Sequence, residues 1–333
     1  MENSLSIEQF KKQFSPKEDD LLKAFFDLQM EKWDFARNNY GALKNSVRKI
    51  FRFTDTEVVA QFNPNRVLST MAVTDPEKIK NRKCFLCEEN LHKEQTGLEL
   101  TENYTMLVNP YPVLSKHFTA KFNIHKPQKI TENFDDLLNI SEIFGEKYFA
   151  LYNGPDCGAS VPEHRHFQAG IASEFTIINE ARTLLQNPSG GKLRAVKTRG
   201  GAELYAAKDF LRNYFLIRGD RKADIRELFF NVFKILEQKF PSERETKINL
   251  VMFKHGADFI LLIFPRKAHR PSVFYNEDET QIKVSPATLD YGGVMVFPRK
   301  EDFDKIDKET IRQIFNEVGF SESDLTAVAD EIE

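Results

Sequence analysis

Three polar side chains alternate along the segment His164-Arg165-His166-Phe167-Gln168. This segment is expected to begin a strand, and residues two apart on a strand point to the same face. A neutral imidazole, with a pKa near 6.5, is a good nucleophile toward phosphorus. We therefore predict that His166 is a catalytic nucleophile and that Gln168 donates to a phosphate oxygen. The alternative is a pair of structural histidines whose hydrogen bonds are satisfied inside the protein.

The loop before this strand, Gly154-Pro155-Asp156-Cys157-Gly158-Ala159-Ser160, is built from small residues. Such residues let phosphate oxygens approach the backbone closely, and successive backbone N–H groups can bind an anion. Gly158, Ala159 and Ser160 are therefore predicted to bind phosphate. Cys157 has no evident catalytic partner and is interpreted as a small loop residue.

Cys84 and Cys87 form a C-x2-C pair, which is typical of half a zinc site or of a redox pair. The sequence has no second C-x2-C, so histidines would have to complete a metal site. His125 ends an expected strand and His164 begins the catalytic one, which would give a tetrahedral Cys2His2 structural zinc. Two ordinary buried thiols are the alternative.

The elements expected around these residues occur twice in the same order. A strand, a helix and two strands are predicted at 118–124, 134–144, 147–153 and 164–171, and again at 214–218, 225–239, 248–253 and 259–264. This weak internal repeat favours an α+β fold with antiparallel sheets flanked by helices over a doubly wound sheet.

We divide the chain into four parts on this pattern. Residues 1–80 hold an N-terminal helix (17–44) and a strand hairpin that pack on the first unit, and residues 81–186 form the catalytic unit. The glycine-rich stretch 187–208 is expected to be a loop or linker. Residues 209–333 form the second unit with a helical tail.

Composition excludes several classes of protein. The chain has 333 residues and a net charge of -3, so a general nucleic-acid binder is not expected. It has no run of 18 apolar residues that could span a membrane and no apolar segment typical of a secretory leader. Three cysteines, an odd and low number, favour a reducing compartment, and we expect a cytoplasmic protein.

The loop and the H-x-H-x-Q segment together resemble the transferase branch of the histidine-triad superfamily. That branch includes galactose-1-phosphate uridylyltransferase, diadenosine tetraphosphate phosphorylase (ATP adenylyltransferase) and the GDP-hexose phosphorylases. The hydrolase branch usually ends its motif in a third histidine, where this chain has Gln168. Further similar stretches are Tyr-Asn-Gly-Pro at 152–155, Asn-Pro-Tyr-Pro at 109–112 with His117-Phe118, Gln-Phe-Asn-Pro-Asn-Arg at 61–66 and Ser-Pro-Ala-Thr-Leu-Asp at 285–290.

The resemblance implies tandem histidine-triad-like units, of which the second lacks the catalytic histidines. It implies a covalent nucleotidyl-His166 intermediate and transfer of the nucleotide from a nucleoside polyphosphate or nucleotide sugar to phosphate or a sugar phosphate. It implies nucleotide contacts by Asn63, Arg66 and Asn153, a zinc site of the order described above, and possible dimerisation. A hydrolase on the same scaffold and a non-catalytic nucleotide-binding protein are the alternatives.

For several charged residues and two histidines the sequence leaves more than one role open. Glu163 is an extra residue between the loop and the motif, and it could turn away, orient a histidine or bind a substrate hydroxyl. Basic residues in the glycine-rich stretch could close over a polyphosphate, although a solvated loop is favoured. The two Phe-Pro-Arg-Lys repeats, at 264–267 and 297–300, could reach phosphates, although surface charge is expected of at least one pair. His255 and His269 are interpreted as surface or loop histidines.

Overall fold

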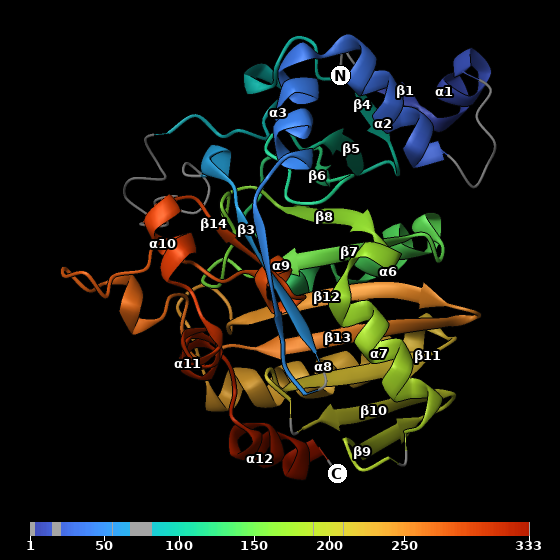
Figure 1. The fold of residues 1–333 in the computed structure, drawn as a ribbon. Helices are drawn as coiled ribbons and strands as arrows, with labels where there is room; N and C mark the ends of the chain where they lie inside the picture. The colour runs from blue at the N-terminus through green and yellow to red at the C-terminus, as the bar shows by residue number, and fades with distance from the viewer. Residues whose placement is uncertain are drawn as a thin grey trace.

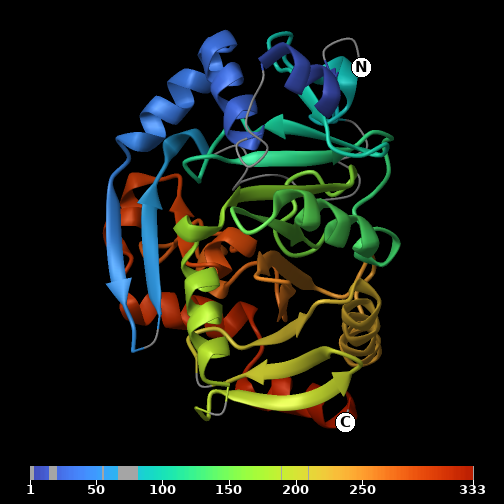
Figure 2. The ribbon, with the colours of Figure 1, turned by 90° about the vertical axis from the view of Figure 1, so that its right-hand side faces the viewer.

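A single 11-stranded sheet, almost wholly antiparallel, runs through the molecule in the order β1-β4-β5-β6-β8-β7-β12-β13-β11-β10-β9 (Figures 1 and 2). The computed structural model describes residues 4–14, 21–54, 56–66, 82–188, 190–208 and 210–332. The strands of this sheet are β1 (Ser4–Ser6), β4 (Gly97–Glu99), β5 (Tyr104–Val108), β6 (Phe118–Phe122), β7 (Tyr148–Asn153), β8 (His166–Ile171), β9 (Leu193–Arg199), β10 (Ala202–Ala207), β11 (Tyr214–Gly219), β12 (Ile248–His255) and β13 (Asp258–Pro265).

The two halves of the sheet have the same connectivity. The chain order β4-β5-β6-helix-β7-β8 of the first half returns as β9-β10-β11-helix-β12-β13 in the second. The halves join where β7 pairs antiparallel with β12, so an approximate two-fold axis relates them. The predicted tandem of α+β units is therefore confirmed, and so is the antiparallel sheet flanked by helices.

The register shows what replaces the catalytic residues in the second unit. Counting outward from the central rung of β7 and β12, Leu262 of β13 occupies the place of Gln168 in β8, and Ile260 that of His166. Both replacements are apolar and fully buried. At these two positions the second unit therefore has buried apolar side chains, where the first unit has the polar side chains of the predicted catalytic strand.

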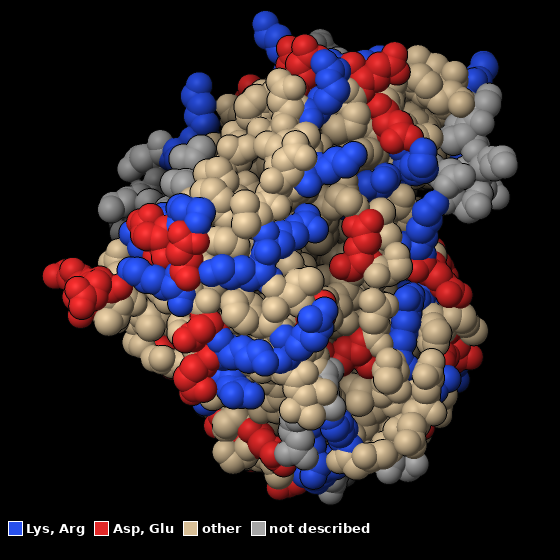
Figure 3. Space-filling view, viewed as in Figure 1, with Lys and Arg blue, Asp and Glu red and all other residues tan. Residues whose placement is uncertain are grey.

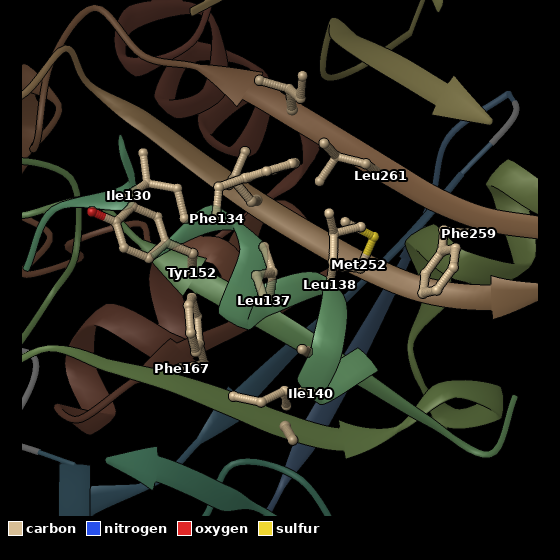
Figure 4. Close-up of a cluster of buried hydrophobic side chains, with 14 of the residues drawn as sticks. Ile130, Phe134, Leu137, Leu138, Ile140, Tyr152, Phe167, Met252, Phe259 and Leu261 are labelled. Atoms are coloured by element: carbon tan, nitrogen blue, oxygen red, sulfur yellow. The ribbon is translucent and has the colours of Figure 1, made fainter. Parts of the chain in front are cut away.

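Helices cover the two faces of the sheet unequally. One face packs against α6 (Phe134–Phe144) and α8 (Lys222–Lys239), and Figure 4 shows Phe134, Leu137 and Phe167 in this core. The opposite face of the second unit is covered by a second hydrophobic cluster, whereas the first unit presents His117, Thr119, His166 and Gln168 on that side. The remaining helices are α1 (Ile7–Phe14), α2 (Leu21–Lys32), α3 (Asp34–Lys44), α7 (Thr176–Gln186), α9 (Thr288–Tyr291), α10 (Lys300–Lys305), α11 (Lys308–Val318) and α12 (Glu322–Ile332).

The N-terminal part is shared between the two units, which corrects the expectation that it packs on the first. Helices α2 and α3 do contact the first unit, through Phe26 on Phe118 and through the Tyr40 hydroxyl on the carbonyl of His117. The hairpin of β2 (Arg48–Arg52) and β3 (Glu57–Phe62), however, pairs with β14 (Val294–Phe297) near the C-terminus. Residues 15–20 and 67–80 of the predicted N-terminal region lie outside the described residues.

The glycine-rich stretch 187–208 is not a loop, and this prediction is wrong. Residues 193–199 and 202–207 form the hairpin β9–β10 at the far end of the sheet. The glycine pair Gly200–Gly201 makes its turn, with Gly200 at φ +56°, a conformation that favours glycine. Two of its basic residues form ion pairs within the protein, Arg194 with Asp330 and Arg199 with Glu227.

The surface carries charges of both signs. On the face drawn in Figure 3, Lys and Arg side chains are interspersed with Asp and Glu. Within the described ranges, no helix is both long enough and apolar enough to cross a membrane.

Candidate active site

Strand β8 begins at His166, two residues later than predicted, so His164 lies in the connection before the strand. Phe167 points into the core shown in Figure 4, and because side chains alternate along a strand, His166 and Gln168 point to the opposite face. The expectation that these two share a face therefore fits the structure. His164 has a different environment, described below.

His166 is held by three hydrogen bonds and is only 3% exposed. Its ring Nδ1 lies 2.8 Å from the carbonyl oxygen of His164, so Nδ1 carries the proton and Nε2 carries the lone pair. The buried side chain of Gln128 accepts from the backbone N–H of His166 and donates to its carbonyl, at 2.9 Å each. Gln128 thus binds the backbone of the strand where the nucleophile sits.

The His166 ring is neutral near pH 7. Burial lowers its pKa from the ordinary value, because a charged ring loses hydration there, while the His164 carbonyl and the nearby Glu163 oppose the shift. A neutral ring protonated on Nδ1 has its nucleophilic nitrogen at Nε2.

A fixed hydrogen-bond chain orients Gln168. The backbone N–H of Val113 donates to Nδ1 of His117 at 3.3 Å, so Nε2 of His117 must be the protonated nitrogen. That nitrogen lies 2.8 Å from Oε1 of Gln168 and donates to it. The amide nitrogen of Gln168 is therefore turned toward the cavity that Gln168 lines. His117 was recognised in a strand pattern of the sequence, but its role was missed.

The loop before β8 is packed against the second unit. Gly158 has φ +109°, and a Cβ there would lie 2.4 Å from Cβ of Ala287, so only glycine fits this contact. The N–H of Ala159 donates to the carbonyl of Gly154 at 3.3 Å. Of the backbone donors expected to bind phosphate, this one already has a protein partner.

Glu163 turns away from the cavity. Its carboxylate receives two hydrogen bonds from Arg82, at 2.9 and 2.8 Å, and Arg82 also donates to the carbonyl of Ser160. The guanidinium lies over the ring of Phe85, between the two cysteines. Arg82, which the sequence did not single out, thereby links the catalytic loop to the C-x2-C turn.

A polar cavity, partly open to solvent, lies between the two units, and the space in it that protein atoms do not fill, open solvent included, is about 640 Å³. Five of the six residues predicted to contact nucleotide line it, and Asn63 does not, since its amide donates to the carbonyl of Pro112 at 3.0 Å. The full lining consists of Arg66, Val113, Asn153, Gly158, Ala159, Ser160 and Gln168 from the N-terminal half and His269, Arg270, Ser285, Ala287, Leu289, Asp290 and Val296 from the C-terminal half.

Asn153 is oriented in the same manner as Gln168. Its Oδ1 accepts from Asn249 at 3.1 Å and from both the N–H and the hydroxyl of Thr288, at 2.9 and 2.7 Å. With the oxygen surrounded by donors, the amide nitrogen is the group left to bind a ligand in the cavity. Two side-chain amides thus present N–H groups to one space, which suits anionic oxygens.

Neither Phe-Pro-Arg-Lys repeat lines the cavity. Arg266 is buried and all five of its N–H donors bind protein acceptors, on Asn249, Pro286, Val318, Ala268 and His269. The second repeat is also engaged, as Arg299 pairs with Asp302 and Lys300 with Asp304, and Lys267 pairs with Asp324. In the C-terminal half it is Arg270 that lines the cavity, and His269 beside it, which lies in a loop as predicted, lines the cavity too.

Cys84, Cys87, His125 and His164 come together as the sequence predicted. Their ligand atoms lie within 4.8 Å of one another, with Cys84 Sγ 3.3 Å from His164 Nδ1 and Cys87 Sγ 3.1 Å from His125 Nδ1. Ligands of a tetrahedral zinc are separated by about 3.4–3.8 Å, given metal bonds of about 2.0–2.3 Å. Nε2 of His164 donates to the carbonyl of Phe122 at 2.8 Å, which leaves Nδ1 free to bind a metal. The cluster could therefore hold a metal ion.

Family comparisons divide the chain into two parts. Residues 25–171 match a family described as a domain of unknown function (DUF4922), and residues 192–333 match the family described as GDPGP1-like, C-terminal domain. The C-terminal match confirms the predicted resemblance to the transferase branch of the histidine-triad superfamily. None of the curated proteins compared with the chain matches it.

Two solved structures are similar to this chain. Yeast Ap4A phosphorylase Apa2 is 14% identical, with a TM-score of 0.49 over 86% of this chain and 94% of that one. A DUF4931 family protein from Bacillus cereus is 16% identical, with a TM-score of 0.32 over 50% of this chain and 83% of that one.

Proposed function

We propose that this protein is a nucleotidyltransferase of the phosphorylase type, which acts on a nucleoside polyphosphate or a nucleotide sugar through a nucleotidyl-His166 intermediate. The observation that carries the proposal is the hydrogen bond from Nδ1 of His166 to the carbonyl of His164, because it leaves the lone pair on Nε2, on the same face of β8 as Gln168. A purely structural histidine has no need of a neighbouring amide aimed into a cavity.

The chemistry proceeds in two displacements at the α-phosphorus. Nε2 of His166 forms a bond to that phosphorus while the bond to the leaving phosphate oxygen breaks, and the electron pair stays on the departing oxygen. An oxygen of inorganic phosphate or of a sugar phosphate then attacks the same phosphorus, and the bond to Nε2 breaks. Gln168 stabilises the charge on the non-bridging oxygens in both steps.

We further propose that the Cys84, Cys87, His125 and His164 cluster binds a structural zinc ion. His164 contributes its ring to the cluster and its carbonyl to Nδ1 of His166. The metal would fix the segment that sets the tautomer of the nucleophile, and it would take no direct part in the chemistry.

The test is to trap label on the protein after incubation with nucleotides and nucleotide sugars radiolabelled at the α-phosphorus. We expect acid-labile, base-stable label on the wild-type protein and on His255→Ala, which removes an exposed histidine, and none on His166→Ala. Equal labelling of His166→Ala and wild type would overturn the proposal. Turnover that is unchanged by added phosphate would assign the protein to hydrolysis instead.

A further inference from the structure

The cavity has a second polar cluster, on the wall formed by the C-terminal half of the chain. Ser285 Oγ lies 3.1 Å from Nε of Arg270, which donates to it, and 3.0 Å from Nε2 of His269. All three residues line the same cavity as Gln168 and Asn153. None of them takes part in the displacement steps described above.

Phe274 and Arg266 hold this cluster in place. The guanidinium of Arg270 lies 4.2 Å above the ring of Phe274, and Arg266 donates to the backbone carbonyls of His269, within the cluster, and of Pro286, which follows Ser285. A guanidinium on an aromatic face keeps its planar edge directed outward, the geometry that suits two oxygens of one phosphate.

The position of the cluster in the cavity indicates which part of the substrate it could bind. In an in-line displacement the leaving oxygen departs on the side opposite the nucleophile. Gln168 lines the cavity from the first unit, whereas His269, Arg270 and Ser285 line it from the second. A phosphate that departs away from the first unit would therefore meet Arg270 and Ser285.

We propose that Arg270, Ser285 and His269 form a phosphate subsite for the group that leaves the α-phosphorus and for the inorganic phosphate that later attacks it. The assignment of that group rests on the proposed function. Arg270 supplies charge and paired donors, Ser285 adds a hydroxyl, and His269 positions the hydroxyl. The second unit thereby has a role in binding although it lacks the catalytic histidines.

Binding of pyrophosphate and inorganic phosphate to the His166→Ala protein tests the subsite without any turnover. We expect both anions to raise its melting temperature, and Arg270→Ala to weaken the apparent affinity about tenfold or more, as removal of a charge-assisted bidentate contact should. Arg270→Lys should recover only part of the affinity, since it restores charge but not the planar fork. Ser285→Ala should weaken it less than Arg270→Ala.

The matched control is Lys267→Ala, which removes a nearby cation that pairs with Asp324 and does not line the cavity. If no anion stabilises the parent protein, or if Arg270→Ala and Lys267→Ala respond alike, the subsite is wrong. Anion binding that depends on Arg270 in a protein that never labels at His166 would keep the subsite and reject the transferase. Labelling at His166 with binding that ignores Arg270 would do the reverse.

Discussion

Nε2 of His117 lies 2.8 Å from Oε1 of Gln168, and this contact decides which end of the Gln168 amide faces the cavity. The direction is set by the backbone, because the N–H of Val113 donates to the other ring nitrogen of His117. His117 therefore acts as a positioning residue. It does not line the cavity, yet it determines that Gln168 offers a donor and not an acceptor to a phosphate oxygen.

Replacement of His117 by alanine should slow labelling of His166 by about 10- to 100-fold with little change in nucleotide affinity, because an unconstrained amide stabilises the transition state less well. His117→Gln retains a donor and an acceptor and should recover part of the rate. Single-turnover labelling measures the rate, and urea unfolding checks that each variant is folded. A large loss of affinity at unchanged rate would assign His117 a purely structural role.

His117 should also make stability depend on pH. Burial, followed by the charge of Arg66, lowers its pKa to about 3, against about 6.5 when unfolded. Between these values the unfolded chain binds a proton that the folded protein does not, so stability falls as the pH drops below 6.5. One pH unit within this window corresponds to about 1.4 kcal/mol. Urea unfolding between pH 7.5 and 5 should show a shallower slope for His117→Gln than for wild type, and His255→Gln, at an exposed position, is the matched control.

The elements and the metal cluster could largely be predicted from the sequence. Alternation defined the catalytic strand and the C-x2-C pair limited the partners of the metal cluster, because both signals are local in the chain. The glycine-rich stretch was predicted wrongly, since Gly200–Gly201 signals a hairpin turn as well as it signals a linker. The pairing of β3 with β14 joins residues more than 200 positions apart, and no pattern within either strand indicates it.

The walls of the cavity were only half predictable. Asn153, Gly158 and Ser160 belong to the catalytic unit and adjoin its motif, whereas Arg270 and His269 reach the cavity only because the two halves of the sheet join at β7 and β12. The sequence could not distinguish Arg266 from Arg270 as the ligand-facing arginine. The difference is that Arg270 lines the cavity whereas Arg266 is buried with its donors bound to protein acceptors, and that is a property of the folded chain.

The Arg82–Glu163 pair should influence the nucleophile through charge. Glu163 raises the pKa of His166 against the larger effect of burial, so Glu163→Gln should lower that pKa further. The acidic limb of the labelling rate, where protonation of His166 stops attack, should then move to lower pH. Loss of the charged partner of a mostly buried arginine should also cost about 1 kcal/mol of stability. A limb that moves to higher pH would contradict this account.

The metal cluster predicts a matched pair of cysteine variants. Purified protein should contain about one zinc per chain. Cys84→Ala should lose it and unfold at a lower temperature, whereas Cys157→Ala, a buried cysteine whose Sγ lies 3.0 Å from the carbonyl of Ile248, should keep it. Metal analysis by mass spectrometry measures the content. Wild-type protein that is free of metal and equally stable in chelator would exclude the zinc site.

The largest loss of stability is expected for substitution of Arg266. It is 2% exposed, its five donors are all bound, and its guanidinium lies 4.5 Å from the ring centre of Tyr291. Arg266→Lys keeps the charge but can offer only three donors from a single nitrogen, so two or more buried carbonyls lose their partner. We expect a loss of about 3–5 kcal/mol, as for other broken buried networks, measured by urea unfolding. Lys267→Arg, at the exposed neighbour, should change stability by less than about 0.5 kcal/mol. If Arg266→Lys were as mild as that control, the carbonyls on Pro286, Ala268 and His269 would not depend on the guanidinium, and the rigidity assigned to the wall that bears Arg270 would have another origin.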